Sequence, residues 1–153
     1  MTFTFSARSY RNLRGVRPEL IAVATLALTR SEIDFVVTEG LRTLQRQMDL
    51  VKEGASRTLD SRHLTGHAID VAALVGGQVT WDWPAFERIA LAFKSAAADL
   101  GIALVWGGDW TGFRDGPHFE LHRKPFPAPR PTAAGTAADP GDPPDDTAGP
   151  SRS

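Results

Sequence analysis

Apolar residues recur at helical spacing in three stretches of the chain. The first spans residues 18–28 and has its apolar positions at Leu20, Val23, Ala24, Ala27 and Leu28. A second helix is predicted after the turn at residues 39–42 and ends at Gly54, and a third runs from about residue 84 to Gly101. The pattern therefore predicts two to three helices, with at least the first and third burying one face.

Between these helices, apolar residues alternate with polar ones or form short runs of strand length. Strands are predicted at residues 33–37, 67–74, 102–106 and 117–121. The glycine pair at residues 76–77 closes the second strand with a turn. Short strands mixed with two or three helices are typical of an α+β domain with a small, mainly antiparallel sheet.

Proline is concentrated at the end of the chain. Eight of the 11 prolines lie in residues 125–153, and no aromatic residue follows Phe126. Residues 129–153 are rich in Pro, Ala, Gly and Asp, so they have too few apolar side chains to offset the entropy lost on ordering. We therefore expect one folded domain at residues 1–128 and a disordered tail at residues 129–153.

The composition excludes several classes of protein. The chain of 153 residues has no cysteine, which excludes disulfide scaffolds, thiolate zinc sites, iron–sulfur clusters and cysteine nucleophiles. Its net charge of −1 is a poor match to a nucleic-acid-binding surface, so no nucleic-acid partner is expected. The apolar run at residues 20–28 is too short to span a bilayer and keeps helical spacing, so we expect neither stable membrane insertion nor a signal peptide.

Histidine is the remaining residue type that could bind a transition metal, together with carboxylates. The four histidines form two close pairs, and the candidate ligands in and near them are His63, His67, Asp70, His118, Glu120 and His122. Three such side chains and one water molecule are the usual ligands of a catalytic zinc. The two pairs therefore mark a candidate metal site.

Strand geometry reduces this set. If residues 67–74 form a strand, His67 and Asp70 point to opposite faces and cannot bind the same ion. His118 and His122 would stand about 13 Å apart on an extended strand, so only one of them can bind that ion. A similar objection, at two residues' separation, weakens Glu120 as a partner of His118. Spacing alone leaves three positions, filled by His63 or His67, by Asp70, and by His118 or His122.

Several stretches around these residues resemble a known family. Residues 61–70 read SRHLTGHAID and fit S-x-H-x-x-G-x-A-x-D, and residues 115–118 read DGPH and fit D/E-x-x-H. The turn at residues 40–43, GLRT, followed by Gln47, resembles a third element, G-x-R-S/T-x-x-x-Q. Together with the WGGDW loop at residues 106–110, these motifs resemble the zinc peptidases that cut peptidoglycan stem peptides. The sequence is most similar to phage endolysins that are L-alanyl-D-glutamate peptidases.

The resemblance implies one Zn²⁺ ion bound by His63, Asp70 and His118, with Asp115 as the catalytic carboxylate. Many relatives have Glu at the position of Asp115, and the shorter Asp must be brought closer to the zinc-bound water. The implied fold is that of D-Ala-D-Ala peptidases and the Hedgehog signalling domain.

The two other histidines are expected to be dispensable for metal binding. His67 occupies a variable position of the first pattern, and His122 lies outside both patterns. We interpret both as surface histidines or as residues behind the ligands.

Two polar residues are candidates for handling the substrate. Arg42 is expected to hold a substrate carbonyl or carboxylate and to stabilise the oxyanion of the tetrahedral intermediate, as a catalytic and substrate-binding residue. A surface ion pair is the alternative role for Arg42. Ser61 is expected to bind substrate or to orient His63, and a simple loop cap is its alternative.

The expected activity is hydrolysis of the L-Ala-D-Glu bond in bacterial peptidoglycan stem peptides, as in host cell lysis by an endolysin. A D-Ala-D-Ala carboxypeptidase or dipeptidase is one alternative, because both enzymes share the zinc motif. A non-catalytic zinc-binding recognition module is another, although the acidic Asp115 beside His118 speaks against it. We expect a monomer that stays in the host cytoplasm until it is released to the cell wall.

Overall fold

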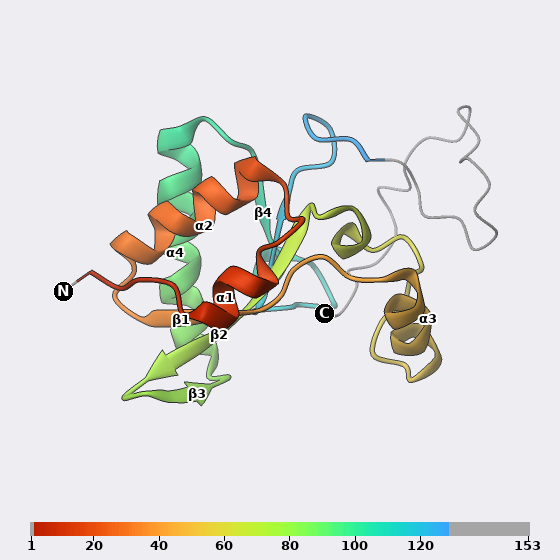
Figure 1. The fold of residues 1–153 in the computed structure, drawn as a ribbon, viewed down its shortest axis with the longest axis horizontal. Coiled ribbons are helices and arrows are strands. Elements are labelled where there is room, and N and C mark those ends of the chain that lie inside the picture. The colour runs from red at the N-terminus through yellow and green to blue at the C-terminus, as the bar shows by residue number, and fades with distance from the viewer. Residues whose placement is uncertain (1, 129–153) are drawn as a thin grey trace.

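The computed structural model describes residues 2–128, so the predicted tail at residues 129–153 lies outside the described residues. Within this range the helices are α1 (Ala7–Asn12), α2 (Pro18–Arg30), α3 (Leu44–Lys52) and α4 (Trp83–Leu100), with short 3-10 helices η1 (Arg62–Thr65) and η2 (Gly107–Asp109). The strands are β1 (Asp34–Glu39), β2 (Ala68–Val75), β3 (Gln78–Thr80), β4 (Leu104–Trp106) and β5 (His118–Leu121). The predicted α+β class with a small antiparallel sheet is confirmed (Figure 1).

The sheet is antiparallel throughout and has the strand order β1-β2-β5-β4, with β3 paired to β2. The predicted turn at Gly76-Gly77 joins β2 to β3, where both glycines have positive φ. The central pairing places β2 directly beside β5, although about forty residues separate them in the sequence. Segments from both halves of the chain therefore meet at the middle of the sheet.

One face of the sheet packs against helices α2 and α4. Phe35 of β1 and Phe119 of β5 both lie against Phe93 of α4, with ring centroids 5.4 and 3.9 Å from it. Ile69 and Val71 of β2 belong to the same buried core. Two helix ends lie where the sequence predicts: Pro18 occupies the first turn of α2, and Gly101, with φ of 67°, ends α4.

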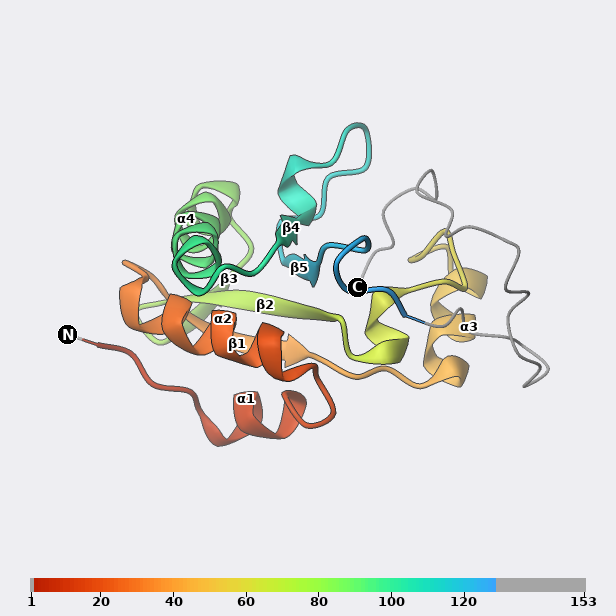
Figure 2. The same cartoon turned by 90° about the horizontal axis from the view of Figure 1, so that it is seen from above.

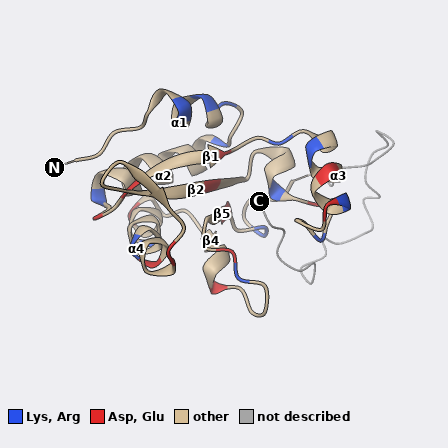
Figure 3. Ribbon diagram, turned by 90° about the horizontal axis from the view of Figure 1, so that it is seen from below, with Lys and Arg blue, Asp and Glu red and all other residues tan. Residues whose placement is uncertain are grey.

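The opposite face of the same strands is polar at one end. Because side chains alternate along a strand, Asp70 points away from the helical core that Ile69 and Val71 enter, and His118 does the same beside Phe119. Asp70 is the one charged residue of β2, and Figure 3 shows acidic colouring on this strand. In two perpendicular views, η1 and α3 lie together at this end, away from α2 and α4 (Figures 1 and 2).

Three details differ from the sequence prediction. Helix α1 is additional; it buries Ser9 as its one buried residue, so it has no apolar stripe that a periodicity search could find. Strand β3 is also additional, and its three residues are mostly exposed. β2 begins at Ala68, so His67 precedes the strand instead of starting it.

Among residues 2–128, no helix combines the length and the apolar character that crossing a bilayer requires.

Candidate metal centre and active site

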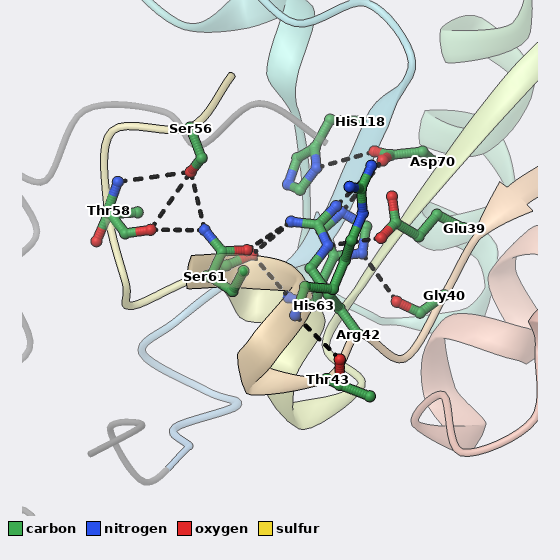
Figure 4. A network of polar contacts seen from close by, with 12 residues as sticks. Glu39, Gly40, Arg42, Thr43, Ser56, Thr58, Ser61, His63, Asp70 and His118 are labelled. Atoms are coloured by element: carbon green, nitrogen blue, oxygen red, sulfur yellow. Dashed lines mark hydrogen bonds and ion pairs between the residues drawn. The ribbon is translucent and has the colours of Figure 1, made fainter. Parts of the chain in front are cut away.

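Asp70 and His118 are direct cross-strand partners at the centre of the sheet. His63 reaches the same point from η1, the short helix that leads into β2. One ligand atom from each of the three residues can be chosen so that all lie within 4.8 Å of one another, and all three side chains are buried. Figure 4 shows the side chains converging on one point. The structure therefore brings together the three residues that the family resemblance names as metal ligands.

His63 is oriented by a backbone carbonyl. Its Nδ1 lies 2.9 Å from the carbonyl oxygen of Gly40, while its Nε2 lies 3.3 Å from Oδ2 of Asp70. Since a carbonyl can only accept, Nδ1 donates to Gly40, and Nε2 is the ring nitrogen that faces the cluster. A side chain at Gly40 would overlap the backbone oxygen of Asn12, so glycine permits this approach.

His118 contacts a carboxylate on each side of its ring. Nδ1 is 3.2 Å from Oδ1 of Asp70, and Nε2 is 3.0 Å from Oε1 of Glu120. Burial disfavours the charged ring and lowers its pKa, but the hydrogen bonds with Asp70 and Glu120 outweigh burial and raise the pKa of His118 to about 10. The two carboxylates therefore favour the protonated, charged ring of His118.

The carboxylate of Asp70 has a pKa below its ordinary value. Burial would raise this pKa, but the nearby charge of His63 and the hydrogen bonds with His118 and His63 lower it further than burial raises it. Asp70 is therefore an anionic ligand candidate between two imidazole rings. Two imidazoles and one carboxylate, without a thiolate, form a donor set that zinc accepts.

Arg42 lies in the wall of the cluster with its side chain fully covered. Its Nε donates to Oε1 of Glu39 at 2.6 Å, and one Nη donates to Gln47 at 2.7 Å and to Oγ of Ser61 at 3.4 Å. The other nitrogen, Nη2, has no hydrogen bond and lies 3.8 Å from Oδ2 of Asp70. The guanidinium thus presents one unused donor nitrogen to the ligand cluster (Figure 4). This arrangement differs from the alternative of a surface ion pair.

Ser61 caps the short helix that holds His63. Its Oγ accepts from the backbone N–H of His63 at 3.3 Å and receives the contact from Arg42. The side chain is buried, so Ser61 links the arginine to the metal-ligand helix.

Asp115 is buried in the loop before β5, three residues ahead of His118. Its backbone N–H donates to the carbonyl of Gly107 at 2.9 Å, and its own carbonyl accepts from the N–H of His118 at 3.3 Å. A Cβ atom at Gly107 would overlap the Asp115 carbonyl and lie 3.1 Å from the Cβ of His118. The absence of a side chain at Gly107 therefore lets this loop pack against the metal-ligand strand.

The other two histidines lie outside the cluster. His67 Nδ1 contacts Oγ1 of Thr65 at 2.8 Å, and burial lowers its pKa to about 4. His122 follows the end of β5, is exposed, and its Nδ1 accepts from the backbone N–H of Lys124 at 3.2 Å. Each therefore has a local structural partner away from the three clustered residues.

The contacts of two acidic residues with the site, Glu39 and Glu120, were not predicted from the sequence. Glu39 accepts a hydrogen bond from Arg42, and Glu120 contacts Nε2 of His118. The sequence indicated Glu120 only as a candidate metal ligand. The spacing contains a signal for the second contact, because residues two apart on a strand share a face. The bulge between Val37 and Glu39, which places Glu39 opposite Asp70, is not visible in the hydrophobic pattern.

An α+β fold with a buried His–Asp–His cluster and a nearby aspartate defines a candidate metal-dependent hydrolase. Comparison with known proteins gives the particular family. The chain belongs to the phage L-alanyl-D-glutamate peptidase family, whose profile matches residues 1–129.

Individual relatives agree with this family. The chain is 38% identical over 136 residues to the L-alanyl-D-glutamate peptidase of Escherichia phage T5, covering 79% of this chain and 99% of that protein. It is 34% identical over 110 residues to the peptidoglycan L-alanyl-D-glutamate endopeptidase CwlK of Bacillus subtilis, covering 62% of this chain and 65% of that protein. The crystal structure of the Serratia marcescens L-Ala D-Glu endopeptidase ChiX superposes with a TM-score of 0.80 at 50% identity, covering 83% of this chain and 96% of that one.

Proposed function

We propose that this protein is a zinc-dependent endopeptidase that hydrolyses the L-Ala-D-Glu bond of peptidoglycan stem peptides. The observation that carries the proposal is the buried cluster of His63, Asp70 and His118, with Asp115 in the adjoining loop, in a chain of this peptidase family. The names of the relatives support L-Ala-D-Glu as the bond that is cleaved, and the two histidines and one aspartate support zinc as the metal.

Zinc fits the cluster by the chemistry of its donors. The hydrogen bond from His63 to Gly40 leaves Nε2 facing Asp70 as the nitrogen that can bind a metal, and the carboxylate of Asp70 lies between both rings. Two histidines and one carboxylate are a common protein ligand set of catalytic zinc, which keeps a further position for water or substrate. A zinc ion held there would lower the pKa of a water molecule and polarise the substrate carbonyl.

Asp115 is the proposed general base. It would take a proton from the attacking water and then donate that proton to the leaving amine of the D-Glu residue. Its carboxylate is carried by a loop whose backbone is tied to Gly107 on one side and to His118 on the other. This anchoring supports a base that keeps a fixed position relative to the metal ligands.

Arg42 is the proposed stabiliser of the oxyanion. Its Nη2 is buried, faces Asp70 and has no hydrogen bond, so it is the nitrogen proposed to donate to a substrate oxygen beside the metal. The contacts with Glu39 and Gln47 hold the guanidinium in place before substrate arrives. Ser61 Oγ is proposed to hold Arg42 and His63 in their relative positions and to contact the substrate chain.

A test of the chemistry uses the full chain and its His118→Ala and Asp115→Ala variants. We expect one zinc per wild-type protein, loss of metal in His118→Ala, and retained metal with lost peptidoglycan cleavage in Asp115→Ala. Full activity in Asp115→Ala, or an active wild-type protein that neither contains nor responds to metal, would overturn the proposal.

The bond is tested by mass spectrometry of fragments released from purified peptidoglycan. Cleavage between L-Ala and D-Glu removes the stem peptide after its first residue and exposes the amino group of D-Glu. A D-Ala-D-Ala carboxypeptidase would release only free D-alanine, and a recognition module would release nothing. The substrate also implies that the enzyme acts at the cell wall, whichever compartment it is made in.

A further inference from the structure

Glu120 lies directly behind one of the clustered histidines. Glu120 and His118 are two residues apart on β5, so their side chains share one face of the strand. Both are buried, and Oε1 of Glu120 lies 3.0 Å from Nε2 of His118. The carboxylate therefore contacts the ring nitrogen that points away from Asp70.

This contact determines which nitrogen of His118 can bind a metal. A carboxylate accepts hydrogen bonds, so its partner Nε2 carries the proton. A metal that binds His118 would displace one of its two N–H protons, and because Nε2 keeps its hydrogen bond to Glu120, the metal would bind Nδ1, the atom 3.2 Å from Asp70. The opposite tautomer would place a proton where the metal must bind and a lone pair against the carboxylate of Glu120.

A buried arginine lies beside the other carboxylate oxygen of Glu120. Arg62 Nε lies 3.6 Å from Oε2 of Glu120, and both side chains are more than nine-tenths buried. The Arg62 guanidinium is itself anchored, since Nη2 donates to the backbone oxygens of Leu121 and Phe126 at 2.9 and 2.7 Å. Because Arg62 precedes His63 in η1, this ion pair also joins the elements that carry the two clustered histidines.

The two imidazoles have different supports. His63 donates from Nδ1 to the carbonyl of Gly40, whereas His118 has the carboxylate of Glu120 behind it. A carboxylate behind a ligating imidazole fixes its tautomer and orientation and increases its basicity. We propose that Glu120 is a positioning residue that sets His118 as an Nδ1 ligand and strengthens metal binding, an inference that rests on the zinc site of the proposed function.

The experiment measures zinc affinity by competition with a chromogenic chelator, for the wild-type chain and for Glu120→Gln and Glu120→Ala. Loss of a group behind a metal ligand costs about ten- to a hundredfold in metal affinity. We expect that loss for Glu120→Ala and a smaller loss for Glu120→Gln, whose amide keeps the side-chain shape and an acceptor oxygen. Glu87→Gln, an exposed change of the same type on α4, should bind zinc like the wild type.

Nitrogen-15 chemical shifts of the imidazoles in the zinc-loaded protein supply a readout that a purely structural role would not move. We expect the His118 signals to show a protonated Nε2 and a metal-bound Nδ1 in the wild type, and a changed Nε2 signal in Glu120→Gln. His63 signals should stay constant. If Glu120→Ala does not fold, Glu120→Gln still decides the question by both measurements.

Wild-type zinc affinity and an unchanged His118 Nε2 signal in Glu120→Gln would overturn the role of Glu120 while leaving the peptidase intact. Failure of the proposed function has a different signature, because the wild-type chain would then bind no zinc or cleave no peptidoglycan. The two failures are therefore separable in one series of samples.

Discussion

Gly107 and Asp115 are in direct backbone contact, joined by the 2.9 Å hydrogen bond from the Asp115 N–H to the Gly107 carbonyl. A Cβ atom on Gly107 would overlap the Asp115 carbonyl and lie 3.0 Å from its Cβ. The neighbours of this added atom are backbone and Cβ atoms, which cannot turn away as the end of a long side chain can. The position of the proposed base thus depends on the absence of a side chain eight residues earlier.

We predict that Gly107→Ala lowers peptidoglycan cleavage by about a hundredfold, the order expected when a catalytic group is misplaced by about 1 Å. The measurement is the cleavage rate at matched zinc content. Gly101→Ala is the control, since Gly101 has φ of 67° at the end of α4 and an added Cβ atom there would meet open space. It should cost about 1 kcal/mol of stability through its left-handed backbone and leave the cleavage rate unchanged. Equal activity in both variants would contradict the prediction.

Replacement of Arg42 by lysine separates charge from geometry. Lysine keeps the positive charge but cannot reproduce the fork that contacts Glu39, Gln47 and Ser61 while Nη2 faces the cluster. We predict that Arg42→Lys lowers kcat by about a hundredfold, as expected for loss of one oxyanion donor, with a smaller change in KM. The kinetics are measured on a soluble stem-peptide substrate.

Thermal unfolding of the same Arg42→Lys sample distinguishes the alternative of a structural role. If Arg42 only held Glu39 in place, the variant would unfold at lower temperature while the folded fraction kept the wild-type kcat. That result would remove Arg42 from the proposed chemistry.

The sequence predicted the parts of the fold that bury many apolar side chains. Helix α4 buries one face and strands β1, β2 and β5 are mostly buried, and all four were predicted within a few residues of their bounds. Helix α1 and strand β3 have none, because α1 buries Ser9 alone and β3 is a short, mostly exposed edge strand. Their formation depends on packing beside β1 and β2, which periodicity does not encode.

The candidate site was predictable only in part for a related reason. Strand spacing left His67 and His122 as alternatives, and the family motif was needed to choose His63 and His118. The structure shows contacts that spacing could not supply, since Nδ1 of His63 meets the carbonyl of Gly40, which is distant in sequence. Such contacts depend on the packing of η1 against the end of β1, which is a tertiary contact that local spacing does not determine.

Metal removal tests the cluster through stability. A ligand that binds only the folded state at about a hundred times its dissociation constant stabilises it by about 2.7 kcal/mol. For a domain of this size that corresponds to about 10 °C in unfolding temperature. We predict that a chelator lowers the unfolding temperature of the wild type by this order and that His118→Ala shows no such difference.

His122→Ala is the matched control for metal removal, because His122 lies outside the cluster and contacts its own loop at Lys124. It should respond to the chelator as the wild type does. Loss of the response in His122→Ala, or its persistence in His118→Ala, would contradict the ligand set.

His67 should make the folded state less stable in acid. Burial, with a further contribution from the nearby charge of Arg62, lowers its pKa to about 4, whereas an unfolded histidine has a pKa near 6.5. Between these values the unfolded chain binds a proton that the folded chain does not, so this contribution to stability is lost as the pH falls from about 6.5 toward 4. Each pH unit in that window costs up to about 1.4 kcal/mol.

His67→Asn keeps a donor for Thr65 without a titrating ring and should therefore lose less stability between pH 7 and pH 5. The free energy of unfolding is measured by urea titration of metal-free protein at both pH values, so that metal release does not enter, and His118 contributes equally to both chains. A ring signal of His67 that titrates near pH 6.5, or equal pH dependence in the two chains, would show that the folded environment does not disfavour its charge.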